Sequence, residues 1–81
     1  MINKFCDVWM INLNYHEPLL AETEEEAKRY VKQWIISEYE LSPETEIQER
    51  YFRHRQSFKY WVEGVERDEY LAYVEPISWA Q

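Results

Sequence analysis

Two stretches of alternating residues dominate the last third of the chain. Phe58, Tyr60 and Val62 alternate with Lys59, Trp61 and Glu63, and Tyr70, Ala72 and Val74 alternate with Leu71, Tyr73 and Glu75. Such alternation is typical of strands. The segment between them, 64–68, holds the only glycine and a cluster of charges. We therefore expect a β-hairpin, with Pro76 closing its second strand and Trp79 folding back as a lid on the core.

An apolar run near the start of the sequence predicts another strand. Residues 5–14 read FCDVWMINLN, a run rich in β-branched and aromatic types and too short for a convincing amphipathic helix. In a strand, one face would carry Cys6, Val8, Met10 and Asn12, and the other Trp9, Ile11 and Leu13. Because both faces hold apolar side chains, we expect an interior strand. Residues 19–21 would briefly extend an edge of the sheet.

Helical spacing of apolar residues indicates one helix, over residues 23–40. Its apolar stripe consists of Ala27, Tyr30, Val31, Trp34, Ile35 and Leu41. Thr23, followed three positions later by Glu26, has the form of a capping box, in which each side chain satisfies a backbone N–H at the helix start. Ser42 and Pro43 are expected to end the helix, because a residue that precedes proline avoids the α conformation.

The three glutamates at 24–26 have two interpretations. They can form an acidic patch that contacts a cation or a basic partner. They are also what a helix start favours, because carboxylates stabilise the positive end of the helix dipole. In addition, Glu24 with Lys28 and Glu25 with Arg29 are i,i+4 pairs in the favourable order. We assign the run to helix initiation.

The segment after Pro43 has two readings. Ser42 as a cap with Pro43 at the first position can open a second short helix, but Ile47, Tyr51 and Phe52 make a poor helical stripe. The alternative, which we prefer, is a strand over residues 46–53 with Ile47 and Tyr51 on one face. The predicted fold is then a small α+β domain of order β-α-β-β-β, with one helix packed on a three- or four-stranded, mostly antiparallel sheet.

The length and composition of the chain indicate a single acidic domain. The 81 residues carry a net charge of −7 and contain no internal repeat or glycine-rich linker, so we expect one compact domain over 1–81. A single cysteine, Cys6, allows no intrachain disulfide and fits a reducing, cytoplasmic location. The sequence lacks the roughly 18 apolar residues that span a bilayer and has no signal-peptide pattern, so no membrane association is expected.

The residues that most often carry catalysis or bind metals are scarce. His16, His54 and Cys6 are the only imidazoles and thiol, and their spacing matches no metal-site motif. One glycine cannot build a glycine-rich phosphate loop. With sixteen acids, close carboxylate pairs are expected by chance and indicate no reaction. We expect no enzyme activity, no metal and no cofactor.

Residues 50–61, RYFRHRQSFKYW, form a basic and aromatic island in an acidic chain. The residues that could bind nucleic acid there are Arg50, Arg53, Arg55, Lys59, Tyr51 and Phe52. Rings that stack on bases and cations that neutralise phosphates are the usual combination for single-stranded nucleic acid. Against this, a net charge of −7 repels a polyanion, and outward-facing arginines are also ordinary strand alternation.

Residues 61–81 carry the opposite charge, a net −4. Acids and rings gather on and beside the predicted hairpin turn: Glu63, Glu66, Asp68, Glu69 and Glu75, with Trp61, Tyr70 and Tyr73. Rings and complementary charge are what specific protein interfaces use for anchoring and steering. A solvated turn that protects an edge strand from aggregation would have the same composition.

These patterns lead to three functional hypotheses. The first is a small acidic protein that binds a basic, nucleic-acid-handling protein and inhibits or modulates it, as phage anti-defence proteins, CRISPR inhibitors and nucleic-acid mimics do. The second is a single-stranded nucleic-acid-binding module that uses residues 50–61. The third is a toxin-neutralising immunity protein. The chain would act as a monomer or a homodimer.

Overall fold

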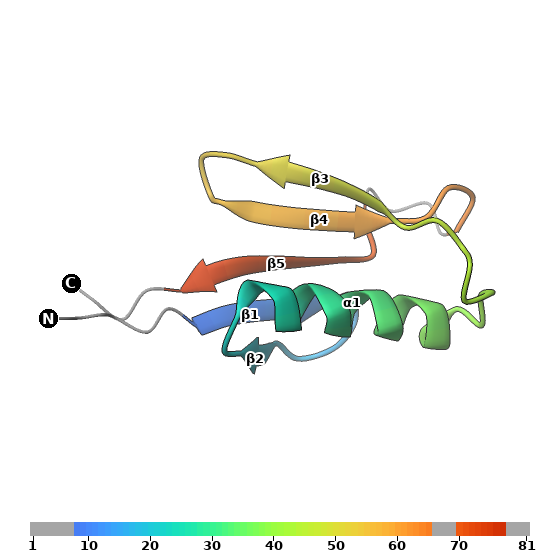
Figure 1. The fold of residues 1–81 in the computed structure, drawn as a ribbon, viewed down its shortest axis with the longest axis horizontal. Helices are drawn as coiled ribbons and strands as arrows, with labels where there is room; N and C mark the ends of the chain where they lie inside the picture. Colours follow the sequence, from blue (N-terminus) through green and yellow to red (C-terminus); the bar gives the residue numbers. More distant parts are fainter. Residues whose placement is uncertain (1–7, 66–69, 78–81) are drawn as a thin grey trace, which may run out of the picture.

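The computed structural model describes residues 8–65 and 70–77 of the chain. These residues form β1 (Val8–Leu13), β2 (Leu19–Ala21), α1 (Glu24–Glu38), β3 (Gln48–Phe52), β4 (Ser57–Trp61) and β5 (Ala72–Ile77). Figure 1 shows α1 running along one part of the sheet, while the β3–β4 hairpin lies away from it. No helix in this part of the chain has both the length and the apolar character that crossing a membrane requires.

The five strands form one antiparallel sheet in the order β2-β1-β5-β4-β3. The predicted fold class, an α+β domain with one helix on a mostly antiparallel sheet, is confirmed. As expected, β1 is an interior strand, since β2 and β5 pair with it on either side. The sheet has five strands rather than three or four because Leu19–Ala21 forms a strand of its own.

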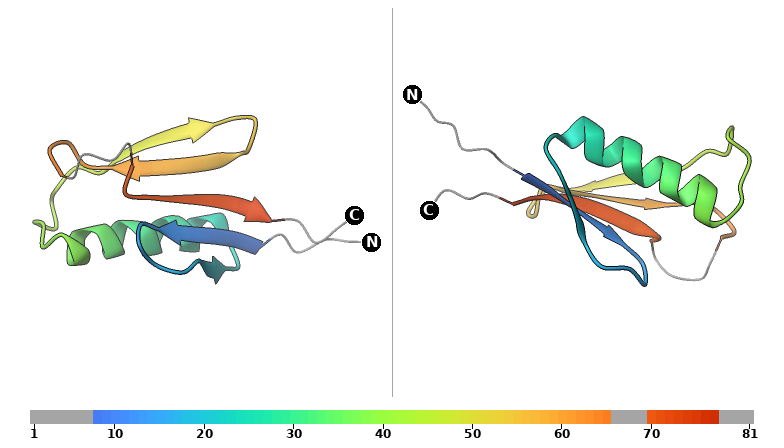
Figure 2. Two further views of the ribbon diagram at one scale, coloured as in Figure 1. Left: turned by 180° about the vertical axis from the view of Figure 1, so that it is seen from behind. Right: turned by 90° about the horizontal axis from the view of Figure 1, so that it is seen from below.

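The core lies between α1 and one face of the sheet. The buried stripe of the helix, Ala27, Val31 and Ile35, belongs to the same apolar cluster as Ile11 of β1 and Val74 of β5. The helix packs mainly on β1, β2 and β5. The right-hand view of Figure 2 shows this layering, and among the described residues no helix or strand covers the opposite face. We call that surface the open face.

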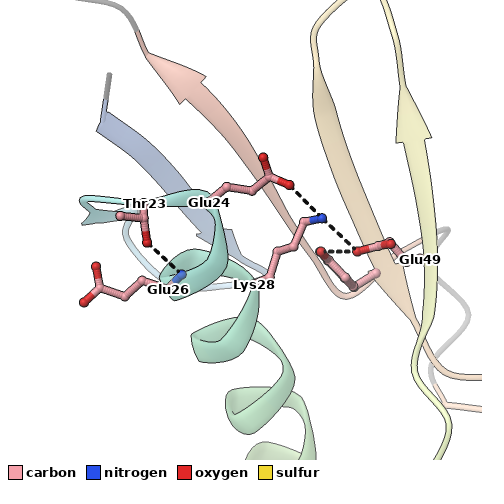
Figure 3. A network of polar contacts seen from close by, with 6 residues as sticks. Thr23, Glu24, Glu26, Lys28 and Glu49 are labelled. Atoms are coloured by element: carbon pink, nitrogen blue, oxygen red, sulfur yellow. Dashed lines mark hydrogen bonds and ion pairs between the residues drawn. The ribbon is translucent and has the colours of Figure 1, made fainter. Parts of the chain in front are cut away.

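The start of α1 confirms the Thr23 half of the capping box (Figure 3), whereas the Glu26 carboxylate accepts from the N–H of Glu22 rather than from that of Thr23. The Thr23 hydroxyl accepts a hydrogen bond from the backbone N–H of Glu26 at 3.0 Å, and the Glu26 carboxylate accepts one from the N–H of Glu22 at 3.1 Å. The predicted Glu24–Lys28 pair forms at 2.9 Å between Nζ and Oε2. The described ion pairs do not include Glu25 with Arg29. A side-chain cap of this kind contributes about 1 kcal/mol, more than one exposed ion pair does.

The helix ends before the predicted Ser42-Pro43 boundary, and its backbone gives the reason. Glu40 adopts a left-handed conformation with φ of 53°. The N–H of Glu40 donates to the carbonyl of Ser37 at 3.3 Å, and the N–H of Leu41 donates to that of Ile36 at 2.9 Å. These two bonds make a Schellman motif, which closes the helix without the proline. Tyr30 lies at the edge of the predicted apolar stripe and is 44% exposed.

After Pro43 the chain forms a strand, β3, and not the alternative short helix. β3 pairs with β4, and β4 pairs with β5, which confirms the predicted hairpin pairing. One detail is corrected: β5 continues through Pro76 to Ile77. Pro76 lies beyond Val74, the last β5 residue paired with β4, so its missing N–H breaks no hydrogen bond on that side. Cys6 and the predicted Trp79 lid lie outside the described residues.

Candidate functional site

The strand register decides which side chains share the open face. Ile11 and Val74 are opposed in the core, so residues of opposite parity along β1 and β5 point to the open face. On the same side, Lys59 of β4 is opposed to both Arg50 of β3 and Tyr73 of β5. Side chains that are far apart in the sequence therefore form one row across three strands.

Two neighbouring hollows lie along this row. The first, which we call the open-face groove, has a volume of about 420 Å³ and is lined by Arg50, Phe52, Lys59, Trp61 and Tyr70. The second hollow has a volume of about 340 Å³ and is lined by Phe52, His54, Arg55, Ser57, Lys59, Tyr70, Tyr73 and Glu75. Three residues line both hollows, so a ligand in one would adjoin a ligand in the other.

Aromatic rings hold the cations of the open-face groove. The Lys59 ammonium lies 4.5 Å from the ring centroid of Phe52 and 4.5 Å from that of Tyr70. The Arg50 guanidinium carbon is 5.2 Å from the Phe52 centroid. Tyr70 in turn meets Tyr73 edge to face at 5.6 Å. These contacts position the rings and cations together, and a cation–π contact of this kind contributes about 0.5–1 kcal/mol at an exposed site.

The two cations of the groove have no described carboxylate as a partner. The ion pairs among residues 8–65 and 70–77 involve Lys28 and Arg55, and neither Arg50 nor Lys59 takes part in one. Residues 48–61 hold four basic side chains and a single acid, Glu49. That acid lies on the helix side of the sheet, where it accepts a hydrogen bond from Tyr60. The open side of the hairpin is thus locally positive in an acidic chain.

The second hollow contains a largely buried carboxylate. The Glu75 side chain is 17% exposed, and its Oε1 lies 3.7 Å from the Arg55 guanidinium. Tyr73 lines the same hollow, and its pKa is raised by burial first and then by the negative charge of Glu75. Like any tyrosine at neutral pH, Tyr73 carries its phenol proton and can donate a hydrogen bond. The hollow combines donors, an acceptor and ring surfaces.

The structure distributes the residues predicted for protein binding over two regions. Trp61 and Tyr70 line the open-face groove, and Tyr73 and Glu75 line the second hollow. Glu63 is exposed after the end of β4. Glu66, Asp68 and Glu69 lie outside the described residues. The rings that were grouped with these acids in the sequence therefore lie among cations in the structure.

The residues predicted for nucleic-acid binding are mostly brought together. Arg50, Phe52 and Lys59 line the groove, and Arg55 lines the second hollow. Arg53 is exposed in the β3–β4 turn. Tyr51 belongs to the other face, where it packs against Phe58 with ring centroids 4.8 Å apart.

Sequence reasoning missed Ser57 and His54 as residues of the second hollow. Ser57 is only 2% exposed although it lies at the start of β4. A signal for Ser57 was present, because alternation with Phe58 and Tyr60 places it on the same face as Lys59 and Trp61. The position of His54 depends on the turn between β3 and β4, for which the sequence pattern gave no geometry.

On the helix side of the sheet, a polar network lies beside a hollow of about 340 Å³ that is lined by Trp9, Glu24, Tyr51, Gln56 and Phe58. The Lys28 ammonium contacts Glu24 at 2.9 Å and Glu49 at 3.6 Å, and lies 3.6 Å from the ring centroid of Phe58 (Figure 3). This network links α1 to the β3–β4 hairpin. Two of the acids that the sequence singled out at 24–26, Glu24 and Glu26, thus have local partners, in agreement with a role in helix initiation.

The described residues form no candidate metal site, and the comparisons with known proteins identify no relative. In the part of the chain that the structure describes, no group of three or more His, Cys, Asp or Glu side chains could hold a metal ion. His16 instead packs against Trp34, with ring centroids 5.5 Å apart. Comparisons with protein-family models, with curated proteins and with solved structures each found no match for this chain.

Proposed function

We propose that the protein binds single-stranded nucleic acid on the open face of its sheet. The observation that carries this proposal is the position of Lys59, whose ammonium lies between the rings of Phe52 and Tyr70 and pairs with no described carboxylate. A cation held beside a ring surface can contact a phosphate while the ring stacks on the adjoining base. This combination supports an anionic ligand that also carries planar rings.

The aromatic lining favours unpaired bases over a duplex. Bases within a duplex stack on one another, so rings on a sheet face reach them only where the strand is single. Phe52, Trp61 and Tyr70 offer such surfaces in the groove, and Tyr73 offers one in the second hollow. Stacking of a base on an aromatic side chain contributes about 1–3 kcal/mol per base and tolerates different bases.

The net charge of −7 opposes this function, and the distribution of charge reduces that opposition. Most acids of the described residues lie outside the β3–β4 hairpin, and those at 24–26 are on the helix, across the sheet from the open face. Layers of secondary structure pack roughly 10 Å apart. The Debye length is about 8 Å at 0.15 M salt, so charges beyond the sheet are substantially screened. The charges nearest to a phosphate in the groove are then Arg50 and Lys59, with Arg55 and Glu75 in the adjoining hollow.

Fluorescence anisotropy with labelled single-stranded DNA and RNA tests the proposal. We expect saturable binding of oligonucleotides of about 12 residues, a length within the usual range for small single-strand-binding folds. The double variant Arg50→Gln with Lys59→Gln should weaken binding strongly. The matched control, Arg29→Gln with Lys32→Gln, changes net charge equally on the exposed side of α1 and should bind more like the wild type.

Salt dependence gives the same experiment a quantitative form. For single strands, each phosphate neutralised contributes about −0.7 to the slope of log K against log salt concentration. The groove variant should therefore have a slope about 1.4 smaller in magnitude than the wild type, while the helix control keeps the wild-type slope. Absence of binding at ~50 mM salt, or equal losses in both double variants, would contradict the proposal.

A basic protein partner is the second candidate, and the charge outside the hairpin favours it. All acids but Glu49 lie outside residues 48–61, together with only five of the nine bases. Such a surface suits an inhibitor that covers a basic groove with carboxylates, in an anti-defence, nucleic-acid-mimic or immunity role. Both candidates are proposed to act in the cytoplasm.

A pull-down separates the second candidate from the first. If an acidic surface at the β4–β5 connection binds the partner, reversing Glu66, Asp68 and Glu69 to lysine should abolish capture of a basic protein from the native host. Unchanged capture in low salt would exclude these acids as the interface. Size-exclusion chromatography with light scattering, run on the same samples, would distinguish a monomer from a homodimer.

A further inference from the structure

We infer that the second hollow is a subsite for a guanine base, recognised through its Watson–Crick edge by the Glu75 carboxylate. This inference rests on the proposed binding of single-stranded nucleic acid and adds base preference to it. The open-face groove, lined by rings and cations, would accept a neighbouring base of any kind.

The inference rests on the burial of the Glu75 carboxylate and on its lack of described hydrogen-bond donors. Its side chain is 17% exposed, and among the described residues it accepts no hydrogen bond shorter than 3.5 Å. Its described charged partner, Arg55, is 3.7 Å away, and the Arg55 side chain is itself 65% exposed. A carboxylate has two oxygens that accept several hydrogen bonds. Removing it from water without donors is unfavourable, so a ligand that brings donors would be stabilised there.

Guanine is the base whose edge matches a carboxylate. Its N1–H and exocyclic N2–H₂ are adjacent donors that can point at the two carboxylate oxygens, in the manner of a bidentate guanidinium. Adenine and cytosine each place a ring-nitrogen acceptor beside their amino group, and that lone pair would face the carboxylate. Uracil and thymine have one N–H between two carbonyl oxygens. Each of these three arrangements directs at least one acceptor at Glu75.

The other residues of the hollow complement the remaining edges of guanine. The Tyr73 phenol and the Arg55 guanidinium supply donors, which suit the guanine acceptors O6 and N7. The ring of Tyr70 supplies a stacking surface and is shared with the open-face groove. Lys59 also lines both hollows, so its ammonium can contact the phosphate that joins nucleotides bound in the two.

Anisotropy titrations with a set of single-base probes test this inference. The probes are oligo-uridine and oligo-thymidine strands that carry one central guanine, adenine, cytosine, inosine or 7-deazaguanine. We expect the guanine probe to bind about tenfold tighter than the adenine and cytosine probes, within the usual discrimination of a bidentate contact. Inosine, which lacks the 2-amino group, should be intermediate. 7-Deazaguanine keeps the Watson–Crick edge but lacks the N7 acceptor, so it should bind more weakly than guanine and still tighter than the adenine and cytosine probes.

The variant Glu75→Gln should lose this preference while it still binds the unsubstituted strands. Its control is Glu63→Gln, which removes an exposed carboxylate outside both hollows and should keep the preference for guanine. Circular dichroism before and after heating checks that both variants fold. If all wild-type probes bind equally, the guanine subsite is wrong and the proposed function stands. If no probe binds the wild type, the proposed function fails and the subsite fails with it.

Discussion

Glu49 of β3 contacts Tyr60 of the neighbouring strand β4 and Lys28 of the helix, and the contact with Lys28 links the hairpin to α1. The Tyr60 hydroxyl donates to its Oε2 at 2.6 Å, and the Lys28 ammonium lies 3.6 Å from the same oxygen. Tyr60 is fully buried, and burial, together with the hydrogen bond to Glu49, raises the pKa of its phenol well above the usual range. The folded chain therefore holds this proton at a pH where the unfolded chain releases it.

Replacing Tyr60 by phenylalanine should alter both the stability and its pH dependence. At pH 7 the variant loses one hydrogen bond to a charged group, and we expect a loss of about 1–2 kcal/mol in the free energy of unfolding. Above about pH 10 the unfolded wild type gives up the phenol proton that the folded state keeps, so wild-type stability falls by about 1.4 kcal/mol per pH unit from this residue. Tyr60→Phe lacks that contribution.

Urea unfolding of both proteins between about pH 7 and 11 measures the effect. The stability difference between wild type and Tyr60→Phe should shrink as the pH rises above 10. Tyr30→Phe, which alters an exposed tyrosine of α1, serves as the control and should show a small and nearly constant difference. A constant gap for Tyr60→Phe across the range would mean that the buried phenol does not hold its proton in this way.

Asn12 is a second residue whose environment predicts a measurable effect. Its Nδ2 is buried, and no described residue accepts a hydrogen bond from it. A buried donor without a partner costs about 1–3 kcal/mol. Replacing Asn12 by leucine, of similar size, should therefore raise the free energy of unfolding by about 1 kcal/mol in a urea titration. A loss of stability would indicate that the amide has a partner in solution.

At the scale of elements, the backbone at the end of α1 is strained at Glu40. Glu40 occupies the left-handed position of the Schellman motif, with φ of 53°, where residues other than glycine are disfavoured by about 1–2 kcal/mol. Its carboxylate also lies at the negative end of the helix dipole. Glu40→Gly should raise the free energy of unfolding by about 1 kcal/mol.

Chemical denaturation of two variants separates the backbone effect from the charge effect at Glu40. Glu40→Gln removes the charge and keeps the strained conformation, so it should recover only a few tenths of a kcal/mol. If the two variants are equally stable, the left-handed conformation contributes nothing, and charge alone accounts for the change.

The elements themselves were largely predictable from local patterns. Thr23 and Glu26 located the helix start, and the alternation around Tyr60 located β4 and its buried face, because both signals act within a few residues. The helix end was less predictable, because the left-handed conformation of Glu40 has no marker such as glycine in the sequence. The strand at Leu19–Ala21 was expected only as an edge, because three residues carry too little alternation to be recognised alone.

At the scale of the whole molecule, the candidate site depends on pairing between distant strands. The alternation of residues placed Lys59 and Tyr60 on opposite faces of the sheet. It gave no information on which residues of β3 and β5 would lie beside Lys59. From sequence alone, Trp61, Tyr70 and Tyr73 were therefore grouped with the acids near the turn as a protein-binding surface. Arg50 and Lys59 were grouped separately, in the basic and aromatic stretch 50–61. Antiparallel pairing of β3, β4 and β5 merges the two sets into one surface.

This merger also explains how an acidic chain can present a positive surface. The bases of residues 48–61 are concentrated on one hairpin, and the acids of 22–26 lie at the start of a helix on the other side of the sheet. Net charge describes the field far from the molecule, whereas a bound phosphate experiences the charges within about a Debye length. We therefore propose that the local arrangement of charge, rather than the net charge, allows the open face to bind its ligand.

Mapping of amide chemical shifts by nuclear magnetic resonance tests that claim most directly. A ¹⁵N-labelled sample is titrated with a single-stranded oligonucleotide at 0.1 M salt. We predict that the largest shifts fall on β3, β4 and the start of β5, around Lys59, Trp61 and Tyr73, while the amides of α1 from Ala27 to Ile35 stay close to their free positions. Shifts concentrated on α1, or no shifts at saturating oligonucleotide, would contradict binding on the open face.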